Sequence, residues 1–328
     1  MSAVEMICPT HRLPLSKAPD DKRFCCSLSC NYPVANSIPR FVPQENYASS
    51  FGLQWNEYRT TQLDSRTGLT ISRDRLTRLL GGSLEVVTGK KVLEAGCGAG
   101  RFSEILLETG AHLYAVDLST AVDANYANCS YFSNYSAWQA SILELPFAPE
   151  QFDIVVCIGV IQHTPNPEEA MAALCRHVKH GGMLVIDHYT YGYPATLSRR
   201  LLRCAMLKLP SSISLRVCKF MSNVLWPLHQ LLWKCKFPPL SSIMRGYFLK
   251  LSPLVDYHDA YPQLSPEQLK DWATLDMHDT LTDYYKHLRS ADEISKTLVE
   301  CGMNRIETAY AGNGVEVRAY KTASSATS

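Results

Sequence analysis

The stretch that decides the fold is KVLEAGCGAGRF, at residues 91–102. Its apolar start has the composition of a buried strand, and Phe102, Ile105 and Leu106 after it are spaced as in an amphipathic helix. Between them stand three alternate glycines: Gly96, Gly98 and Gly100. Glycines so placed let the backbone turn sharply and let a ligand lie directly on main-chain atoms. The stretch therefore predicts a parallel strand, a tight turn and a helix N-terminus that form a binding loop.

Further apolar segments, separated by helical patterns, predict strands at residues 112–116, 136–140, 152–158 and 183–187. Strands that alternate with helices indicate a doubly wound α/β fold with a parallel sheet. Near the C-terminus, residues 305–310 and 315–320 flank the turn at residues 312–314, which is Gly-Asn-Gly. This arrangement predicts an antiparallel hairpin that closes one edge of the sheet.

The composition is that of an ordinary globular protein, with 46% hydrophobic and 19% charged residues among 328. Residues 1–30 lack an uninterrupted apolar core, so we expect no signal peptide. No apolar run reaches the roughly eighteen residues that a membrane-spanning helix needs. The twelve cysteines then favour a reducing compartment, with thiols free or bound to metal, and predict a cytoplasmic protein.

The glycine loop resembles motif I of the class I S-adenosylmethionine-dependent methyltransferases. Asp117, at the end of the second predicted strand, resembles the acid with which this family binds the ribose hydroxyls. Two longer segments follow the family pattern almost position by position: FDIVVCIGVIQHTPNPEEA at residues 152–170 and VKHGGMLVIDHY at residues 178–189. The resemblance implies a Rossmann-like, doubly wound sheet of seven mostly parallel strands in the order 3-2-1-4-5-7-6. It also implies S-adenosyl-L-methionine as the cofactor.

The same resemblance indicates which residues hold the cofactor. Ser141 stands where the family usually has an Asp that binds the adenine amino group; a hydroxyl still accepts a hydrogen bond, but without charge assistance. Arg59 is expected to pair with the cofactor's carboxylate, unless it is a solvated residue of a packing helix. Asp117 has the alternative of a surface acid that caps the next helix. The predicted cofactor-binding residues are Arg59, Glu94, Gly96, Cys97, Gly98, Gly100, Asp117, Leu118, Ser141, Ile142, Ile158 and Gly159.

Residues 1–45 form a cysteine-rich head. Cys8 and His11 make a C-x-x-H pair, and Cys26 with Cys30 supplies two further ligands for a tetrahedral metal site. Zinc favours thiolate and imidazole ligands in small structural units. The segment resembles the short zinc ribbon of many bacterial methyltransferases, although His11 stands where that ribbon usually has a cysteine. The alternative is a ribbon that keeps its shape without metal.

For a hydroxyl acceptor, the enzyme must supply an in-line approach and a base. A neutral imidazole suits the base near pH 7, which makes His163 the first candidate and His188 the second. Asp276 and His278 lie in a late segment that resembles one facing the acceptor pocket in relatives, and they are further candidates. The alternative for His163 is a structural role, in which it shapes its loop through a backbone hydrogen bond.

Residues 191–285 are an insertion, and we expect them to form a helical cap that binds the acceptor. Residues 188–255 hold ten Lys or Arg and no acid. One predicted helix face is apolar and consists of Val217, Met221, Val224, Leu225, Leu228, Leu231 and Leu232. This face either belongs to a lid over the acceptor site that touches an anionic membrane or admits a lipid-linked acceptor, or packs on the core with the basic residues solvated. Nucleic acid ranks last as a partner, because the aromatic residues look apolar-facing rather than spaced for base stacking.

These observations predict four parts: the head (1–45), linking helices over the cofactor site (46–88), the core (89–190 and 286–322) and the cap (191–285). The predicted function is O-methylation of a small, glycosylated or lipid-linked metabolite by a cytoplasmic protein in peripheral contact with a membrane. One alternative is an RNA or protein methyltransferase that docks its substrate through the head. A second alternative is a non-catalytic interaction module built on the same fold.

Overall fold

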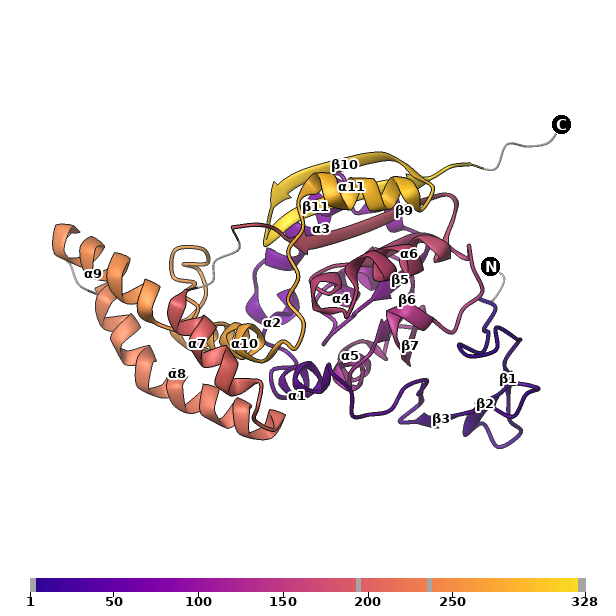
Figure 1. Ribbon diagram of the computed structural model, residues 1–328, viewed down its shortest axis with the longest axis horizontal. Coiled ribbons are helices and arrows are strands. Elements are labelled where there is room, and N and C mark those ends of the chain that lie inside the picture. Colours follow the sequence, from indigo (N-terminus) through magenta and orange to yellow (C-terminus); the bar gives the residue numbers. More distant parts are fainter. Residues whose placement is uncertain (1–3, 193–195, 235–237, 324–328) are drawn as a thin grey trace.

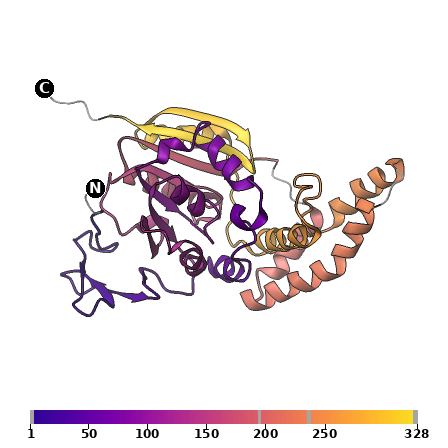
Figure 2. The ribbon, with the colours of Figure 1, turned by 180° about the vertical axis from the view of Figure 1, so that it is seen from behind.

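A central sheet lies between a small head and a helical cap. The computed structural model describes residues 4–192, 196–234 and 238–323, and for residues 238–244 it describes the backbone alone. Figure 1 shows the head, in indigo, and the cap, in orange, at opposite ends of the molecule. Figure 2 shows the same arrangement from behind.

The strands of the central sheet are β5 (Lys91–Ala95), β6 (His112–Asp117), β7 (Tyr135–Gln139), β8 (Phe152–Cys157), β9 (Val178–Tyr189), β10 (Met303–Ala311) and β11 (Gly314–Lys321). Their spatial order is β7-β6-β5-β8-β9-β11-β10. From β7 to β9 in this order, each strand pairs in parallel with the next, whereas β11 runs antiparallel to both β9 and β10. Counted along the chain, the order is 3-2-1-4-5-7-6, as predicted.

Helices cover both faces of the sheet, because its strands are apolar on both sides. In β8, Val155 and Cys157 belong to one hydrophobic layer, whereas Ile154 and Val156 belong to the other. The first layer includes α6 (Pro167–His177) and α11 (Ala291–Glu300), and the second includes α3 (Ile71–Leu79), α4 (Ser103–Glu108) and α5 (Ala121–Cys129). This arrangement confirms the predicted doubly wound α/β fold.

The head is a small antiparallel sheet fixed to the edge strand β7. Its strands are β1 (Ser16–Lys17), β2 (Arg23–Cys25), β3 (Asn31–Ala35) and β4 (Ile38–Pro39). The buried Arg40, directly after β4, forms an ion pair with Asp123 at 2.5 Å and donates a hydrogen bond to Gln139 of β7 at 3.2 Å. The Phe41 N–H also donates to the Gln139 carbonyl, at 2.8 Å. Charge-assisted hydrogen bonds of this kind hold the head in place against the sheet.

The helices of the cap are α7 (Leu197–Met206), α8 (Ser211–Lys234), α9 (Pro238–Leu251) and α10 (Pro266–Thr282). They have a hydrophobic core of their own around Trp226 and Trp272. Two helices of the linking segment, α1 (Ser49–Glu57) and α2 (Asp64–Thr67), run between the head and α3, and α1 packs against α10. Within the described ranges, no helix is both long enough and apolar enough to cross a bilayer.

Helix α8 turns a different face inward from the predicted one. Its buried residues are Ser214, Leu215, Cys218, Ser222, Trp226, His229 and Leu232. From the predicted apolar face, Val224, Leu228 and Leu231 are instead exposed, by 54%, 45% and 66%. The physical reason is that Ser222 and His229 each have a hydrogen-bond partner at 2.6 Å inside the cap. About half of the predicted face is therefore left on the outside.

Candidate functional site

A cavity of about 400 Å³ opens where strands β5, β6 and β8 end. Parallel strands bring their carboxyl ends to one edge, which is the usual ligand site of a doubly wound sheet. One wall is the loop after β5, a second is α1, and a third is formed by α10 and the segment before it. Core and cap therefore face the same enclosed space.

The loop after β5 brings bare backbone to this cavity. Gly96 has a φ of 83°, in the left-handed region that favours glycine, and a Cβ there would lie 2.2 Å from Cγ2 of Val160. The N–H groups of Gly96 and Cys97 both donate to the Val116 carbonyl, at 2.7 and 3.0 Å. Both the conformation and the lack of space therefore require glycine at position 96.

Asp117, at the end of β6, closes the other side of the loop. Its carboxylate accepts hydrogen bonds from the Gly98 N–H at 2.9 Å, and from the N–H and Oγ of Ser119 at 2.8 and 2.7 Å. Burial raises the pKa of this carboxyl above its ordinary value, although the three hydrogen bonds oppose the shift. No cationic side chain of the described residues pairs with it. A carboxylate without a counter-charge suits hydroxyl groups, which donate to it without bringing a charge.

Helix α1 lays aromatic side chains across the cavity. Phe51 and Trp55 both line it, and the Trp55 ring lies 3.6 Å from the place where a Cβ of Gly98 would be. The helix can come this close because Gly52 faces the start of α5, where a Cβ would lie only 2.4 Å from Oγ1 of Thr120. The glycine loop is therefore covered by aromatic rings.

Most of the predicted cofactor-binding residues lie on the cavity wall. Those that line it are Gly96, Cys97, Gly98, Asp117, Leu118, Ile142, Ile158 and Gly159. Those that do not are Arg59, Glu94, Gly100 and Ser141. Gly100 has a φ of 101° and turns the loop toward α4, so its role is to shape the loop.

The other three residues away from the wall have roles elsewhere. Glu94 is buried beneath the loop, where Ser103 Oγ donates to it at 2.5 Å and burial raises its pKa to about 8. Ser141 begins a short turn, and its Oγ accepts a hydrogen bond from the Leu143 N–H at 3.2 Å. Arg59 lies just beyond α1 with an exposed side chain and does not line the cavity, so its contact with the cofactor's carboxylate stays a prediction.

His163 lines the cavity in the turn after β8, and a hydrogen bond holds its ring in one orientation. Its Nδ1 lies 3.1 Å from the Tyr285 carbonyl, which can only accept a hydrogen bond, so Nδ1 carries the proton of the neutral ring. Burial lowers the pKa of this imidazole below its ordinary value, which keeps it neutral at pH 7. Within the described part of the chain, Nε2 has no hydrogen-bond partner. An oriented, neutral imidazole with a free nitrogen has the properties of a base.

The other two histidines predicted as catalytic do not reach the cavity. His188 is buried with its Nδ1 2.7 Å from the Tyr189 carbonyl, and burial lowers its pKa to about 4. His278 is also buried, with one ring nitrogen 2.6 Å from Gln54 Oε1 and the other 3.3 Å from Ser214 Oγ. Burial lowers the pKa of His278 to about 4 as well. The predictions fail because both rings are held inside the protein by neighbouring groups.

Asp276 of α10 does reach the cavity, as does Asp279 on the same helix. The Tyr257 hydroxyl donates to the Asp276 carboxylate. Burial raises the pKa of Asp276 to about 7 and that of Asp279 to about 6. The cap therefore contributes two carboxyl groups that are partly protonated near neutral pH.

His163, Asp279 and Asp283 place three possible metal-ligand atoms within 4.8 Å of one another. Asp283 already has two cationic partners, since Arg203 Nε lies 2.8 Å and Lys286 Nζ 3.0 Å from its carboxylate. These charges neutralise the buried acid. We therefore interpret the group as an ion-pair network that joins α7 to the end of α10.

The lining residues that were not predicted from the sequence include Arg75, Arg101 and Tyr257. They come from α3, from the turn before α4 and from the segment before α10. Sequence patterns do not show that these segments meet. Only Arg101 carried a signal, because a residue directly after Gly100 must lie beside the glycine loop.

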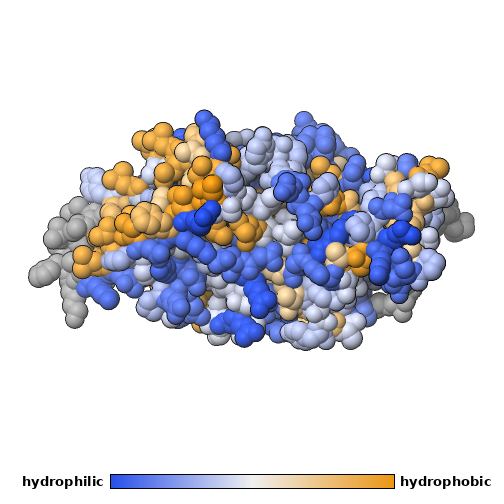
Figure 3. Space-filling model, turned by 90° about the horizontal axis from the view of Figure 1, so that it is seen from below, coloured by the Kyte–Doolittle hydropathy of each residue, from blue (hydrophilic) through white to orange (hydrophobic). Residues whose placement is uncertain are grey.

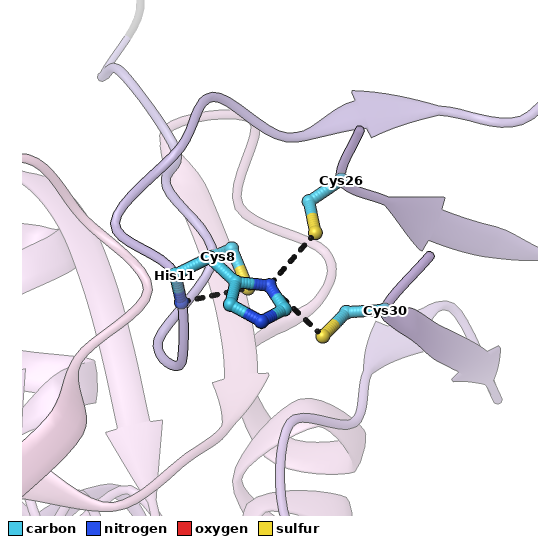
Figure 4. Close-up of side chains that lie close together, drawn as sticks. All are labelled: Cys8, His11, Cys26 and Cys30. Carbon is cyan, nitrogen blue, oxygen red and sulfur yellow. Dashed lines mark hydrogen bonds between the residues drawn. The ribbon is translucent and has the colours of Figure 1, made fainter. Parts of the chain in front are cut away.

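The head holds a second cluster, formed by Cys8, His11, Cys26 and Cys30 (Figure 4). His11 Nδ1 lies 3.4, 3.5 and 3.8 Å from the Sγ atoms of Cys26, Cys30 and Cys8. With Zn–S bonds of about 2.3 Å and Zn–N bonds of about 2.0 Å, the N-to-S edge of a tetrahedral site measures about 3.5 Å. The hydrogen bond with His11 also lowers the pKa of the Cys26 thiol to about 6. Both the spacing and the donor atoms fit a structural zinc site.

The sequence from β5 to β9 matches a known protein family. Residues 93–186 match the family described as a methyltransferase domain. The match includes the glycine loop, Asp117 and His163, and it extends neither to the head nor to the cap.

Curated relatives that match this part of the chain are named ubiquinone biosynthesis O-methyltransferase. The chain is 36% identical to the one from Pseudomonas fluorescens (strain SBW25) over 101 residues, which cover 30% of this chain and 44% of the relative. It is 33% identical to the one from Azoarcus sp. (strain BH72) over 114 residues, which cover 34% and 49%. The chain therefore spans less than half the length of these relatives.

Among solved structures, the chain is similar to magnesium protoporphyrin IX methyltransferase from Synechocystis PCC 6803 with bound S-adenosylmethionine. The sequence identity is 14% and the TM-score 0.39, over 76% of this chain and 78% of the other. A likeness at this level carries no weight for function.

S-adenosylmethionine is the cofactor of a methyltransferase domain, and the cavity fits it. Asp117 offers a carboxylate for the ribose hydroxyls, and the side chains of Leu118 and Ile142 give an apolar surface for the adenine ring. Gly159 has a φ of 76° and no atom within 4 Å of the place where a Cβ would be. This wall therefore leaves room that a ligand can fill.

Proposed function

We propose that the protein transfers a methyl group from S-adenosylmethionine to a hydroxyl of a small, glycosylated or lipid-linked metabolite. The observation that carries this proposal is the free Nε2 of His163, on the same cavity wall as the glycine loop and Asp117. The O-methyltransferase names of the curated relatives support the choice of oxygen as the methylated atom.

The chemistry needs little from the protein beyond position and a base. When bound, S-adenosylmethionine supplies an activated methyl group on its sulfonium. The rings of Phe51 and Trp55 line the cavity and would limit the access of water to it. The glycine loop and Asp117 would hold the cofactor, and His163 Nε2 would accept the proton of the acceptor hydroxyl. The products are a methyl ether and S-adenosylhomocysteine.

The test is transfer of a labelled methyl group from S-adenosylmethionine into cell extract, followed by separation into RNA, protein, lipid and small molecules. We expect label in the small-molecule or lipid fraction, and at least about a hundredfold slower transfer by His163→Ala. Label in RNA or protein would contradict the proposal and favour a substrate that docks on the head. Cofactor binding without any transfer would favour a non-catalytic module.

We also propose that the cap places this cytoplasmic enzyme at the surface of an anionic membrane. Its outer face carries exposed apolar side chains from α7, α8 and α9: Leu197, Leu201, Phe220, Val224, Leu228, Leu231, Tyr247 and Leu251. Figure 3 shows apolar residues gathered at the cap end of the molecule. Contiguous apolar surface of this kind on a folded protein marks an interaction site.

The basic residues of the cap indicate which kind of partner binds its apolar outer face. The exposed cap residues Arg200, Lys208, Arg216, Lys234 and Lys250 have no carboxylate partner among the described residues; Lys236, also counted in the basic stretch, lies outside them. Basic residues beside exposed apolar ones are typical of surfaces that bind anionic lipid, each adding about 1 kcal/mol. A lipid-linked acceptor would reach the cavity from such a surface.

Co-sedimentation with phosphatidylcholine vesicles, with and without phosphatidylglycerol, tests this placement. We expect binding only to the anionic vesicles, and at least about tenfold weaker binding by Phe220→Ser/Val224→Ser. The matched control is Val299→Ser, which changes a 61% exposed apolar residue on α11, outside the cap. Self-association of the wild type, abolished by the double variant, would instead assign the face to a second copy of the chain.

We further propose that Cys8, His11, Cys26 and Cys30 hold a structural zinc ion. The distances around His11 Nδ1 support a tetrahedral site, and thiolate and imidazole donors suit zinc. Because the head packs on β7 through Arg40, a metal in the head would stabilise that edge of the sheet.

A further inference from the structure

Arg101 is a cation on the cavity wall that the protein leaves without a counter-charge. It is mostly buried and lines both the main cavity and a second hollow of about 430 Å³ beside it. Its Nε donates to Ser72 Oγ at 2.8 Å and its Nη1 to Gln62 Oε1 at 2.9 Å, so both partners are neutral. In the described part of the chain, no carboxylate lies within ion-pair distance of it and Nη2 has no partner.

The guanidinium is nevertheless held in place. It lies 5.3 Å from the centre of the Phe102 ring and 5.4 Å from that of Trp272. Cation–π contacts and the two hydrogen bonds together fix its plane. A partly desolvated cation that is held rigidly and unpaired is unfavourable, unless a ligand supplies the missing anion.

A second cation stands next to Arg101. Arg75 lies 5.9 Å from the same Phe102 ring and lines the same two spaces. Its own counter-charge is the buried Asp187 at the end of β9. Burial first, and then the charge of Arg75, lower the pKa of Arg101 to about 10, which still leaves it charged at neutral pH.

Two acids act on the charge of Arg101 without forming an ion pair with it. Asp276 of α10 acts on the charge of Arg101; burial raises the pKa of Asp276 to about 7, and its carboxylate accepts a hydrogen bond from the Tyr257 hydroxyl. Asp64 also acts on Arg101, but its carboxylate accepts hydrogen bonds from the N–H groups of residues 72 and 73 at the start of α3. Among the described residues, neither acid forms an ion pair with Arg101.

We propose that Arg101, with Arg75 beside it, binds an oxyanion carried by the methyl acceptor. A guanidinium presents parallel N–H donors that match a carboxylate or phosphate group. The acceptor would then carry two groups: a hydroxyl that reaches His163, and an anion that lies where the cavity meets the second hollow. This inference rests on the proposed methyltransferase function and narrows its substrate class to anionic hydroxyl compounds.

The methionine part of the cofactor also carries a carboxylate, so it is a second candidate for the anion that Arg101 binds. The two sources differ in one measurable respect. If Arg101 belongs to an acceptor subsite, it binds added anions even when S-adenosylhomocysteine fills the cofactor site. If it instead binds the methionine carboxylate, S-adenosylhomocysteine already occupies it and added anions do not bind.

Calorimetric titration with benzoate and with inorganic phosphate, at constant ionic strength and saturating S-adenosylhomocysteine, tests the proposal. We expect wild-type protein to bind at least one of these anions, and Arg101→Gln to bind it at least about tenfold more weakly, which is 1.4 kcal/mol. Arg101→Lys keeps the charge without the planar fork and should give an intermediate loss. The matched control is Arg176→Gln, which removes an exposed arginine of α6 away from both spaces and should change nothing.

Two results would overturn the proposal. One is that the wild type binds S-adenosylhomocysteine but neither anion. The other is that Arg101→Gln weakens S-adenosylhomocysteine tenfold while anion binding is unchanged, which would assign the guanidinium to the methionine carboxylate. Failure of the wild type to bind S-adenosylhomocysteine at all would instead contradict the proposed function. Thermal unfolding of each variant shows that it is folded.

Discussion

The Gly98 N–H donates a hydrogen bond to the Asp117 carboxylate across 2.9 Å, and this contact joins the loop after β5 to the end of β6. The two strands are parallel neighbours, so their carboxyl ends meet at one edge of the sheet. A bare backbone loop and an uncompensated acid are thereby fixed on one cavity wall. This is the geometry on which cofactor binding in our account depends.

Gly96→Ala should destabilise the protein and abolish cofactor binding. A Cβ there would lie 2.2 Å from Val160 Cγ2, and the φ of 83° disfavours any side chain. We expect a loss of roughly 2–5 kcal/mol in the free energy of unfolding, measured by urea denaturation. The matched control is Gly246→Ala in α9, where no atom lies within 4 Å and alanine favours the helix. Equal stability of the two variants would contradict the account of the loop.

The pH dependence of methyl transfer should distinguish the two candidate bases. The active form of His163 is neutral, so the rate falls as pH drops through its pKa, which burial holds below the ordinary 6.5. If Asp276 were the base, the fall would begin near pH 7, where burial places its pKa. We expect an acid limb below pH 6.5 in kcat profiles, and the same limb in Asp276→Asn. A limb near pH 7 that disappears in Asp276→Asn would show that Asp276, not His163, is the base.

His278 should matter for stability rather than for cofactor binding. Its ring bridges α1 and α8 through Gln54 and Ser214, so His278→Ala leaves buried polar groups unpaired and costs about 1–3 kcal/mol. Its pKa is about 4 when folded and about 6.5 when unfolded, so the unfolded state binds more protons between these values. The wild type therefore loses stability as pH falls from 6.5 toward 4. His278→Ala should show a shallower loss, with unchanged affinity for S-adenosylmethionine.

Metal removal should destabilise the head. Purified protein should contain about one zinc ion per chain, and chelation should lower the melting temperature. Cys26→Ser should lose the metal, because Cys26 Sγ is 3.4 Å from His11 Nδ1. The neighbouring Cys25→Ser is the matched control, since the Cys25 thiol instead donates to Asn31. Metal-free protein with unchanged melting would show that the ribbon keeps its shape without zinc.

The order of the strands could be predicted because it follows from local patterns. The glycine loop and the apolar segments between helical stretches were sufficient to predict the strands of the core. The start of β9 was placed too late, because the strand was predicted at residues 183–187 alone. In the structure the strand begins at Val178, and Gly182 is needed because a Cβ there would lie 2.8 Å from two backbone carbonyl oxygens.

The acceptor end of the site could not be predicted, because it depends on contacts between distant segments. Arg75 and Arg101 meet over the ring of Phe102, although no spacing in the sequence relates α3 to the glycine loop. The same reason explains why the wrong face of α8 was predicted to be buried. Ser222 and His229 face inward because they form hydrogen bonds with Thr274 and Asp256 in other segments. Residue type alone gave no indication that His278 would bridge helices.

The most direct test of the central claim is calorimetric titration of S-adenosylmethionine into the wild type and into Asp117→Ala. The account predicts micromolar affinity for the wild type and at least about tenfold weaker binding for the variant, which loses the acceptor for two ribose hydroxyls. The unfolding curve of the variant serves as the control for its fold. A wild type that does not bind the molecule, or a folded Asp117→Ala variant that binds it as tightly, would contradict the account.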